Sequence, residues 1–260
     1  MPIQPIDRRR FLQVTGAAAL SATVAGCADA MTGRDGADEN VVLGPPEGHD
    51  RADPDRVQYP IYGEPIPDVT VPAPLQNREV TTTEFHGERH AFYTFVFTRC
   101  PGACPGLMGT LRHVQDDAIE EGYADEVAFL PITFDPAHDT PEVLAEYEET
   151  YGIEHEPGHW YTLRPEDETD AKAVVEEEFG CAFDPAEPDD DGENGHDEEM
   201  GHDDGNGHDE EDEGGHEMAF VHHVLLLLVN KDGYVERAYS GEVPTPGDVV
   251  EDTRAVVEGW

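Results

Sequence analysis

One stretch of the sequence limits the fold more than any other, because a buried strand, two cysteines and a helix follow one another directly. Residues 90–98 are aromatic and β-branched, which is typical of a buried strand. Cys100 and Cys104 come next, and apolar residues then recur at helical spacing over 105–121. This order predicts an α/β fold that presents both thiols where the strand ends and the helix begins.

The rest of the chain from about residue 59 continues this alternation. A weakly alternating segment at 79–85 predicts an edge hairpin, and a turn at 230–233 leads into a strand that ends at 239. The other predicted strands are 126–134, 160–163 and 220–229, and the other predicted helices begin at 140 and cover 168–179 and 245–258. We therefore expect one α/β domain over 59–260, with a central mixed sheet flanked by helices.

The charge of the chain excludes some classes of partner. There are 59 Asp and Glu against 15 Lys and Arg, which gives a net charge of −44. Nucleic-acid binding needs basic residues on phosphates, so we expect no nucleic-acid partner and no basic docking patch for anionic lipid. The composition resembles that of proteins from extreme halophiles, in which concentrated salt screens the repulsion.

The N-terminus has the features of an export signal. The arginines at 8–10 precede Phe-Leu and an apolar stretch over 14–25, an order that resembles a twin-arginine signal. That stretch is too short to favour a permanent membrane span. Val24-Ala25-Gly26-Cys27 then resembles a lipobox, so we predict a signal peptide at 1–26, lipidation of Cys27 and a flexible tether over 27–58. The protein would be exported folded and lipid-anchored at the extracytoplasmic face of the cell membrane.

An acidic, glycine-rich segment at 187–217 interrupts the domain. It contains no Lys or Arg and cannot bury a core, so we predict a disordered loop inserted before the strand at 220–229. Its histidines indicate weak, labile metal binding, with a salt-adapted linker as the alternative. They are His196, His202, His208 and His216.

The two cysteines suit metal or redox chemistry. A helix N-terminus lowers the pKa of a thiol, and three intervening residues leave a loop wide enough for two sulfurs to hold one ion. The alternative is that both are small buried apolar residues, although Pro and Gly in a strand-to-helix turn favour presentation over packing. Cys181 is the remaining thiol of the domain, and we expect it to be buried and structural.

These motifs resemble the SCO/SenC family. The run Phe97-Thr98-Arg99-Cys100 continues as Pro-Gly-Ala-Cys104-Pro, and the next predicted strand is followed by Asp135-Pro-Ala-His-Asp139-Thr-Pro. Both segments are similar to signatures of that family, and the resemblance covers roughly residues 60–258. It implies a thioredoxin-like fold.

The resemblance also implies one copper ion bound by Cys100, Cys104 and His222. The count back from the turn at 230–233 favours His222, but His223 follows directly and the assignment could be reversed. Two thiolates and an imidazole suit Cu(I), and Cu(II) becomes possible if water or a carboxylate completes the coordination. Asp135 is the candidate carboxylate beside His222, or else a turn residue before Pro136.

Two functions remain open at this point. The family implies a monomeric copper chaperone, not an enzyme, whose partner is cytochrome c oxidase subunit II or a similar copper protein with a dinuclear copper site. The alternative is a thiol–disulfide oxidoreductase in which Cys100 and Cys104 form the redox pair and reduce the cysteines of that client. A histidine beside two thiolates favours the metal function.

Overall fold

The computed structural model describes residues 40–49, 57–156, 158–185 and 220–260, and for residues 184, 185 and 220–222 it describes the backbone alone. The predicted signal peptide, Cys27 and the acidic insert lie outside the described residues. The strands are β1 (Thr70–Ala73), β2 (Arg78–Thr81), β3 (His90–Val96), β4 (Val127–Thr133), β5 (Phe183–Pro185), β6 (Phe220–His222), β7 (Leu225–Val229) and β8 (Val235–Ser240). The helices are α1 (Ala103–Glu121), α2 (Pro141–Tyr151), α3 (Glu168–Ala171), its π-helical continuation η7 (Lys172–Glu178), and α4 (Pro246–Gly259), with short 3-10 turns at η4 (Pro74–Gln76), η5 (Thr82–Phe85) and η6 (Ala124–Glu126).

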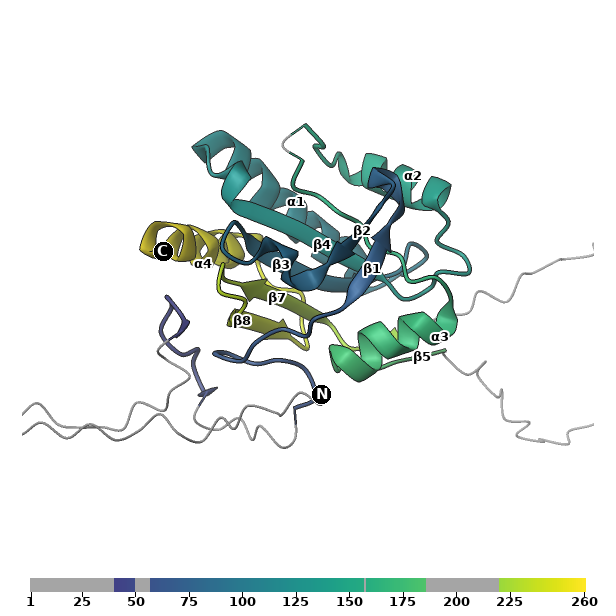
Figure 1. Ribbon diagram of the computed structural model, residues 1–260, viewed down its shortest axis with the longest axis horizontal. Helices are drawn as coiled ribbons and strands as arrows, with labels where there is room; N and C mark the ends of the chain where they lie inside the picture. The colour runs from purple at the N-terminus through teal and green to yellow at the C-terminus, as the bar shows by residue number, and fades with distance from the viewer. Residues whose placement is uncertain (1–39, 50–56, 157, 186–219) are drawn as a thin grey trace, which may run out of the picture. The chain divides into compact units, whose positions relative to one another are not determined.

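A four-stranded mixed sheet in the order β4-β3-β7-β8 forms the centre of the fold (Figure 1). β3 runs parallel to β4 and antiparallel to β7, and β7 runs antiparallel to β8. β3, β4 and β7 are buried along their whole length, as expected for strands covered on both faces. The predicted mixed sheet flanked by helices is confirmed.

Each face of β3 packs against different elements. Phe92 stacks on Phe129, which in turn stacks on Trp160, with ring centroids 5.3 and 5.2 Å apart. On the opposite face Tyr93 and Phe95 contact Phe179, which directly follows η7. Aromatic pairs at these separations add to the free energy that burial already provides. The sheet is therefore fixed from both sides.

Two predicted strands were wrong in detail. Residues 160–163 form only isolated parallel bridges to β4, because Pro131 has no N–H to donate at the middle of that ladder. Residues 220–229 form two strands, since β6 pairs with β5 while β7 joins the central sheet. The chain changes partner at His223, whose N–H donates to the carbonyl of Ala182.

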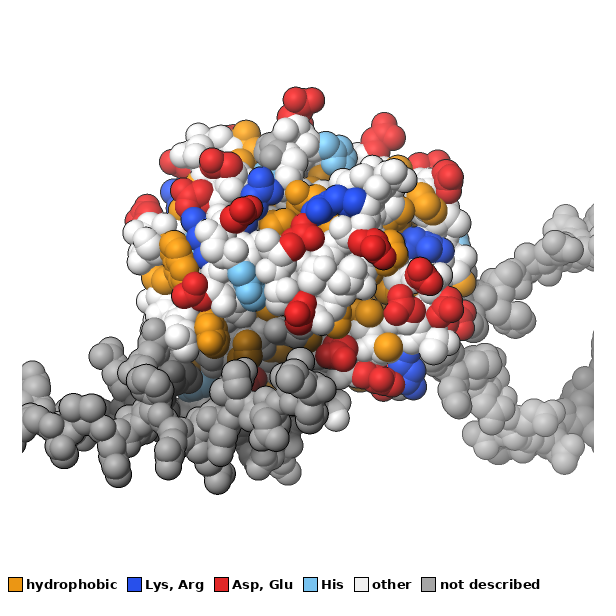
Figure 2. All heavy atoms as spheres, in the orientation of Figure 1, with side chains coloured by type: hydrophobic (Ala, Val, Ile, Leu, Met, Phe, Trp, Pro, Cys, Tyr) orange, Lys and Arg blue, Asp and Glu red, His pale blue; other side chains and the backbone are white. Residues whose placement is uncertain are grey.

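The surface carries the acidic excess without concentrating it. Figure 2 shows Asp and Glu side chains spread over the face in view, with fewer Lys and Arg among them. Several basic residues are paired, including Lys231 with Glu126 at 2.8 Å and Arg237 with Asp252 at 3.2 Å. Pairs of this kind contribute little stability each, and salt screens them.

Residues 40–44, which we call the strap, lie against β8 although they belong to the predicted tether. The buried carboxylate of Glu236 accepts hydrogen bonds from the backbone N–H groups of Val42 and Leu43, at 2.8 and 2.9 Å. Asn230 joins them, because its side-chain N–H₂ donates both to Glu236 and to the carbonyl of Asn40. A buried charge that has this many donors holds the strap in place.

We predict that Glu236→Gln lowers the free energy of unfolding by about 2–4 kcal/mol, because the amide turns a donor toward buried N–H groups that need an acceptor. Urea denaturation at constant salt measures the change. Glu242→Gln is the matched control, since it removes the same charge from an exposed position. Equal stability of the two variants would show that the carboxylate does not hold the strap.

Candidate metal centre

The two cysteines lie together where β3 leads into α1. α1 begins at Ala103, so Cys104 is in its first turn and Cys100 lies just before it. The backbone N–H of Cys104 points at the sulfur of Cys100 at 3.5 Å, and the thiol of Cys104 is hydrogen-bonded to Cys100. Cys104 is buried and Cys100 half-buried. The structure thus brings together the two predicted sulfur ligands.

The proton affinity of the pair differs from the sequence-based expectation. The hydrogen bond to Cys100 and burial raise the pKa of the Cys104 thiol far above its ordinary value. The predicted lowering is therefore wrong for Cys104, since the helix N-terminus does not outweigh these two effects. A metal ion that binds both sulfurs must displace a proton that Cys104 holds firmly.

Asp139 fixes the position of the cysteine loop, a role that sequence reasoning did not assign. Its buried carboxylate accepts hydrogen bonds from the backbone N–H and hydroxyl of Thr98 and from the hydroxyl of Thr133. Thr98 lies two residues before Cys100, and Thr133 is the last residue of β4. Burial raises the pKa of Asp139. The second Asp of the Asp-Pro-Ala-His-Asp motif was the available signal.

Asp135 is held by the residue next to Cys100. Its carboxylate lies 2.6 Å from a terminal guanidinium nitrogen of Arg99, and it is almost fully buried. Its carbonyl also accepts from the N–H groups of His138 and Asp139, which is the predicted turn before α2. Asp135 is therefore close to the cysteine loop, in an ion pair that the sequence did not indicate.

A run of aromatic rings connects the cysteine loop to β6. Phe97 follows β3 and lies 5.1 Å from Phe134, which follows β4, and Phe134 stacks on Phe183 at 4.8 Å. Phe183 pairs with His222 across the β5–β6 ribbon. The backbone of His222 is thus carried by a ribbon that packs at the same end of the sheet as the cysteines. Its side chain lies outside what the structure describes.

The two neighbours that could compete with these ligands have other contacts. The exposed ring of His223 lies 5.9 Å from the ring of Tyr59, and its carbonyl accepts from the thiol of Cys181 at 3.3 Å. Cys181 is fully buried, and burial raises its pKa to about 12. The prediction that Cys181 is a buried structural residue is confirmed.

Two tyrosines of α2 stand near the cysteine pair. The rings of Tyr147 and Tyr151 meet edge to face at 5.0 Å. Burial raises the pKa of Tyr147 well above its ordinary value, and negative charge on Tyr151 and on the two cysteines would raise it further. Both phenols therefore stay neutral beside a thiolate, which makes them possible hydrogen-bond donors to it.

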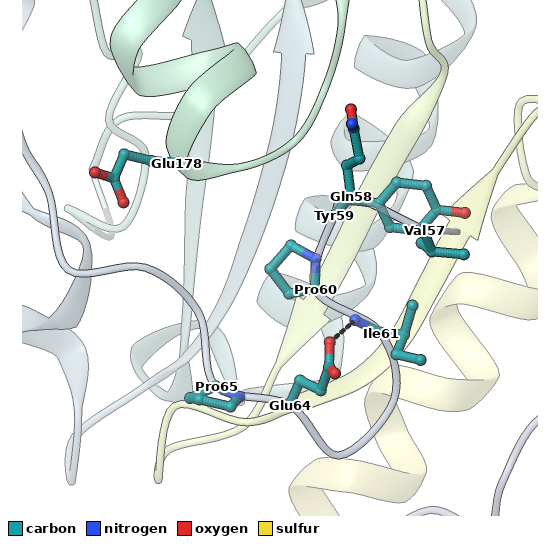
Figure 3. A pocket seen from close by; sticks show the side chains of 8 residues that line it. All are labelled: Val57, Gln58, Tyr59, Pro60, Ile61, Glu64, Pro65 and Glu178. Atoms are coloured by element: carbon teal, nitrogen blue, oxygen red, sulfur yellow. Dashed lines mark hydrogen bonds between the residues drawn. The ribbon is translucent and has the colours of Figure 1, made fainter. Parts of the chain in front are cut away.

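The pocket in Figure 3 is separate from the sulfurs. It measures about 250 Å³ and is lined by residues 57–61, 64, 65 and 178. Its carboxylate Glu64 accepts a hydrogen bond from the N–H of Ile61 at 3.0 Å and so closes its own turn. No group of three His, Cys, Asp or Glu that could hold a metal ion occurs among the described side chains, a search that does not reach the imidazole of His222. Nor is any helix in the described part of the chain long and apolar enough to cross a membrane.

Comparison with known proteins decides the family. A model of the SCO1/SenC family matches residues 75–258, which include the cysteine loop, the Asp139 motif and β6. The chain belongs to the SCO1/SenC family. Sco proteins take part in copper binding and in the assembly of cytochrome c oxidase.

Individual Sco proteins resemble the chain in part of the sequence and in the fold. It is 38% identical over 72 residues to protein sco1 of Schizosaccharomyces pombe, an alignment that covers 28% of this chain and 27% of that protein. The chain spans about a quarter to a third of the length of the curated relatives it matches. A solved SCO1/SenC family lipoprotein from Bacillus anthracis has a TM-score of 0.52 at 18% identity, over 79% of this chain and 99% of that one. Arabidopsis thaliana ScoI, solved with copper bound, has a TM-score of 0.51 at 16% identity, over 76% and 98%. These likenesses confirm the predicted thioredoxin-like fold.

We predict that Asp139→Asn lowers the free energy of unfolding by about 1–3 kcal/mol and exposes Cys104 to thiol reagents. The amide cannot accept all three hydrogen bonds, so Thr98 and the adjacent cysteine loop lose their attachment to β4. Denaturation and the rate of reaction with a chromogenic disulfide measure the two effects. Asp125→Asn, at an exposed position, is the control. A stability loss without faster modification of Cys104 would contradict the positioning role.

Proposed function

We propose that this Sco protein is a copper chaperone that carries one copper ion on Cys100, Cys104 and His222. The observation that supports this most is the pair of adjacent, hydrogen-bonded thiols at the start of α1. Solved Sco proteins have been obtained with copper bound, including those of Arabidopsis thaliana and yeast. The donors present fit the cargo, because soft sulfur ligands select Cu(I).

The choice of His222 as third ligand rests on two arguments. The aromatic run from Phe97 through Phe134 and Phe183 ties the backbone partner of His222 to the end of the sheet that carries the cysteines. The ring of His223 contacts Tyr59 instead, and adjacent residues of an extended chain point to opposite sides. Asp135 is committed to Arg99 and would assist the site from outside the ligand set.

The client that we propose is the dinuclear copper site of cytochrome c oxidase subunit II or of a similar copper protein. Thiolates of the client would replace the ligands of this chain one at a time, since Cu(I) with few ligands leaves room for an incoming sulfur. Protons return to Cys104 as its sulfur is released, and its raised pKa favours that release.

We further propose that the chain is anchored by a lipid on Cys27 at the outer face of the cell membrane. The twin-arginine-type signal and the lipobox support this, and one solved relative is a lipoprotein. A high-salt environment is consistent with the net charge of −44.

A thiol–disulfide oxidoreductase is the second candidate. The close approach of the Cys104 N–H to the Cys100 sulfur, at 3.5 Å, shows that the two residues lie near enough to exchange with a disulfide of a client. In that case Cys100 would be the attacking sulfur, because it is the more exposed of the two.

An anaerobic Cu(I) titration of the reduced chain against a competing chelator tests the chaperone proposal. We expect one tight equivalent in the parent and in His223→Ala, and an affinity at least about 100-fold lower in His222→Ala, or about 2.7 kcal/mol. Loss in His223→Ala instead would reverse the histidine assignment. No tight copper in the parent, with a Cys100–Cys104 disulfide that exchanges readily with thiols, would favour the oxidoreductase.

Fractionation of cells that produce the chain tests the anchor. We expect the parent in the membrane fraction, and Cys27→Ser in the soluble fraction because it cannot be lipidated. Cys181→Ser is the control, because it changes a cysteine that is buried in the domain. If Cys27→Ser also stays with the membrane, the lipid anchor is wrong.

A further inference from the structure

A second pocket, separate from the cysteines, is formed where α2 meets the segment after it. It measures about 510 Å³, and its lining includes Glu148, His155, Gln76, Trp160 and Tyr161. Glu148 belongs to the last turn of α2, whereas His155 follows that helix and Gln76 belongs to η4. None of these residues takes part in the proposed copper site.

Glu148 is a buried carboxylate whose two oxygens are treated differently. Only 1% of the residue is exposed. Oε1 accepts from the hydroxyl of Thr162, which itself accepts from the indole N–H of Trp160 at 3.1 Å. Oε2 has no hydrogen-bond partner among the described residues. Outer-shell bonds of this kind orient the carboxylates that bind metals.

The distance from the second oxygen to its neighbour suggests an ion between them. Glu148 Oε2 lies 3.4 Å from Nε2 of His155, whose side chain is 55% exposed. An N–H···O hydrogen bond is normally about 2.7–3.2 Å long. Two ligands of a tetrahedral ion with bonds of about 2.1 Å are separated by about 3.4 Å. The two atoms thus already have the spacing of ligands on one metal.

The surroundings favour a cation at this point. Burial raises the pKa of Glu148, so the ionised carboxylate lacks a compensating charge of sufficient strength. Oε1 of Gln76 is a second buried oxygen in the lining with no hydrogen-bond partner in the described structure. Its amide N–H₂ donates to the carbonyl of Trp160 at 3.1 Å, which leaves the oxygen as the remaining acceptor.

We propose that Glu148 Oε2 and His155 Nε2 bind a divalent transition-metal ion of the zinc class, with Gln76 Oε1 and water as further donors. Imidazole nitrogen and carboxylate oxygen are ordinary ligands of such ions. Two strong protein ligands make an open site of moderate affinity. The ion would fasten the segment that contains His155 to the end of α2, and this proposal does not depend on the copper site.

Thermal unfolding with Zn²⁺ tests the site in the full chain with Cys100→Ser and Cys104→Ser, which removes the thiol ligands. We expect Zn²⁺ to raise the Tm of this parent and to leave the Tm of Glu148→Gln and His155→Ala unchanged. An ion bound equally by the folded and unfolded chain causes no such rise, so sites outside the fold do not interfere. His138→Ala is the matched control, since His138 is an exposed histidine elsewhere in the fold and should keep the full shift.

Each variant is compared with its own metal-free Tm, so a loss of stability from the substitution does not obscure the result. Equal shifts in all four proteins, or no shift in the parent, would overturn the proposal and leave a plain His155–Glu148 ion pair. A shift lost in only one of the two ligand variants would also overturn it, because both atoms are required. Diffraction from crystals soaked in Zn²⁺ should place an anomalous peak between the two atoms, and its absence would refute the site.

Discussion

The hydrogen bonds of Asp139 are the constraint on which the rest of the candidate metal centre depends. One buried carboxylate joins Thr98, at the start of the cysteine loop, to Thr133, at the end of β4. Strands that run parallel carry no direct connection between their carboxyl ends, so a side chain has to supply it. Because Cys100 follows Thr98 so closely, the position of its sulfur relative to the sheet is set by this carboxylate. Arg164 supports the same loop, since its guanidinium donates to the carbonyls of Asp139 and Pro136.

The sequence predicted the elements of the core well because their patterns are local. The aromatic run of β3, the apolar period of α1 and the Thr140 cap of α2 all appear where they were expected. The cysteine pair was also predictable, since both residues belong to one short loop. Long-range pairing was not predictable: the apolar run that contains β6 and β7 reads as one strand, and only its partners β5 and β3 separate it into two.

The missing parts of the site have the same cause. The pKa of Cys104 depends on burial by residues distant in the sequence, so its thiol is a weaker acid than a helix N-terminus alone would make it. The ion pair of Arg99 with Asp135 joins two loops, and neither residue signals the other. The partners of Glu148 come from the segment after α2, and in the sequence this residue reads as one more exposed acid of a helix.

The strap changes how far the domain can travel from a lipid on Cys27. A free chain up to residue 58 would let the domain move about 110 Å from its anchor, at roughly 3.5 Å per residue. With residues 40–44 held by Glu236, only residues 28–39 remain between the anchor and the domain, which allows about 45 Å. The volume that the cysteine loop can search falls roughly tenfold, and its effective concentration at a membrane-bound client rises accordingly. One buried carboxylate far from the sulfurs would thereby set how often the protein meets its partner.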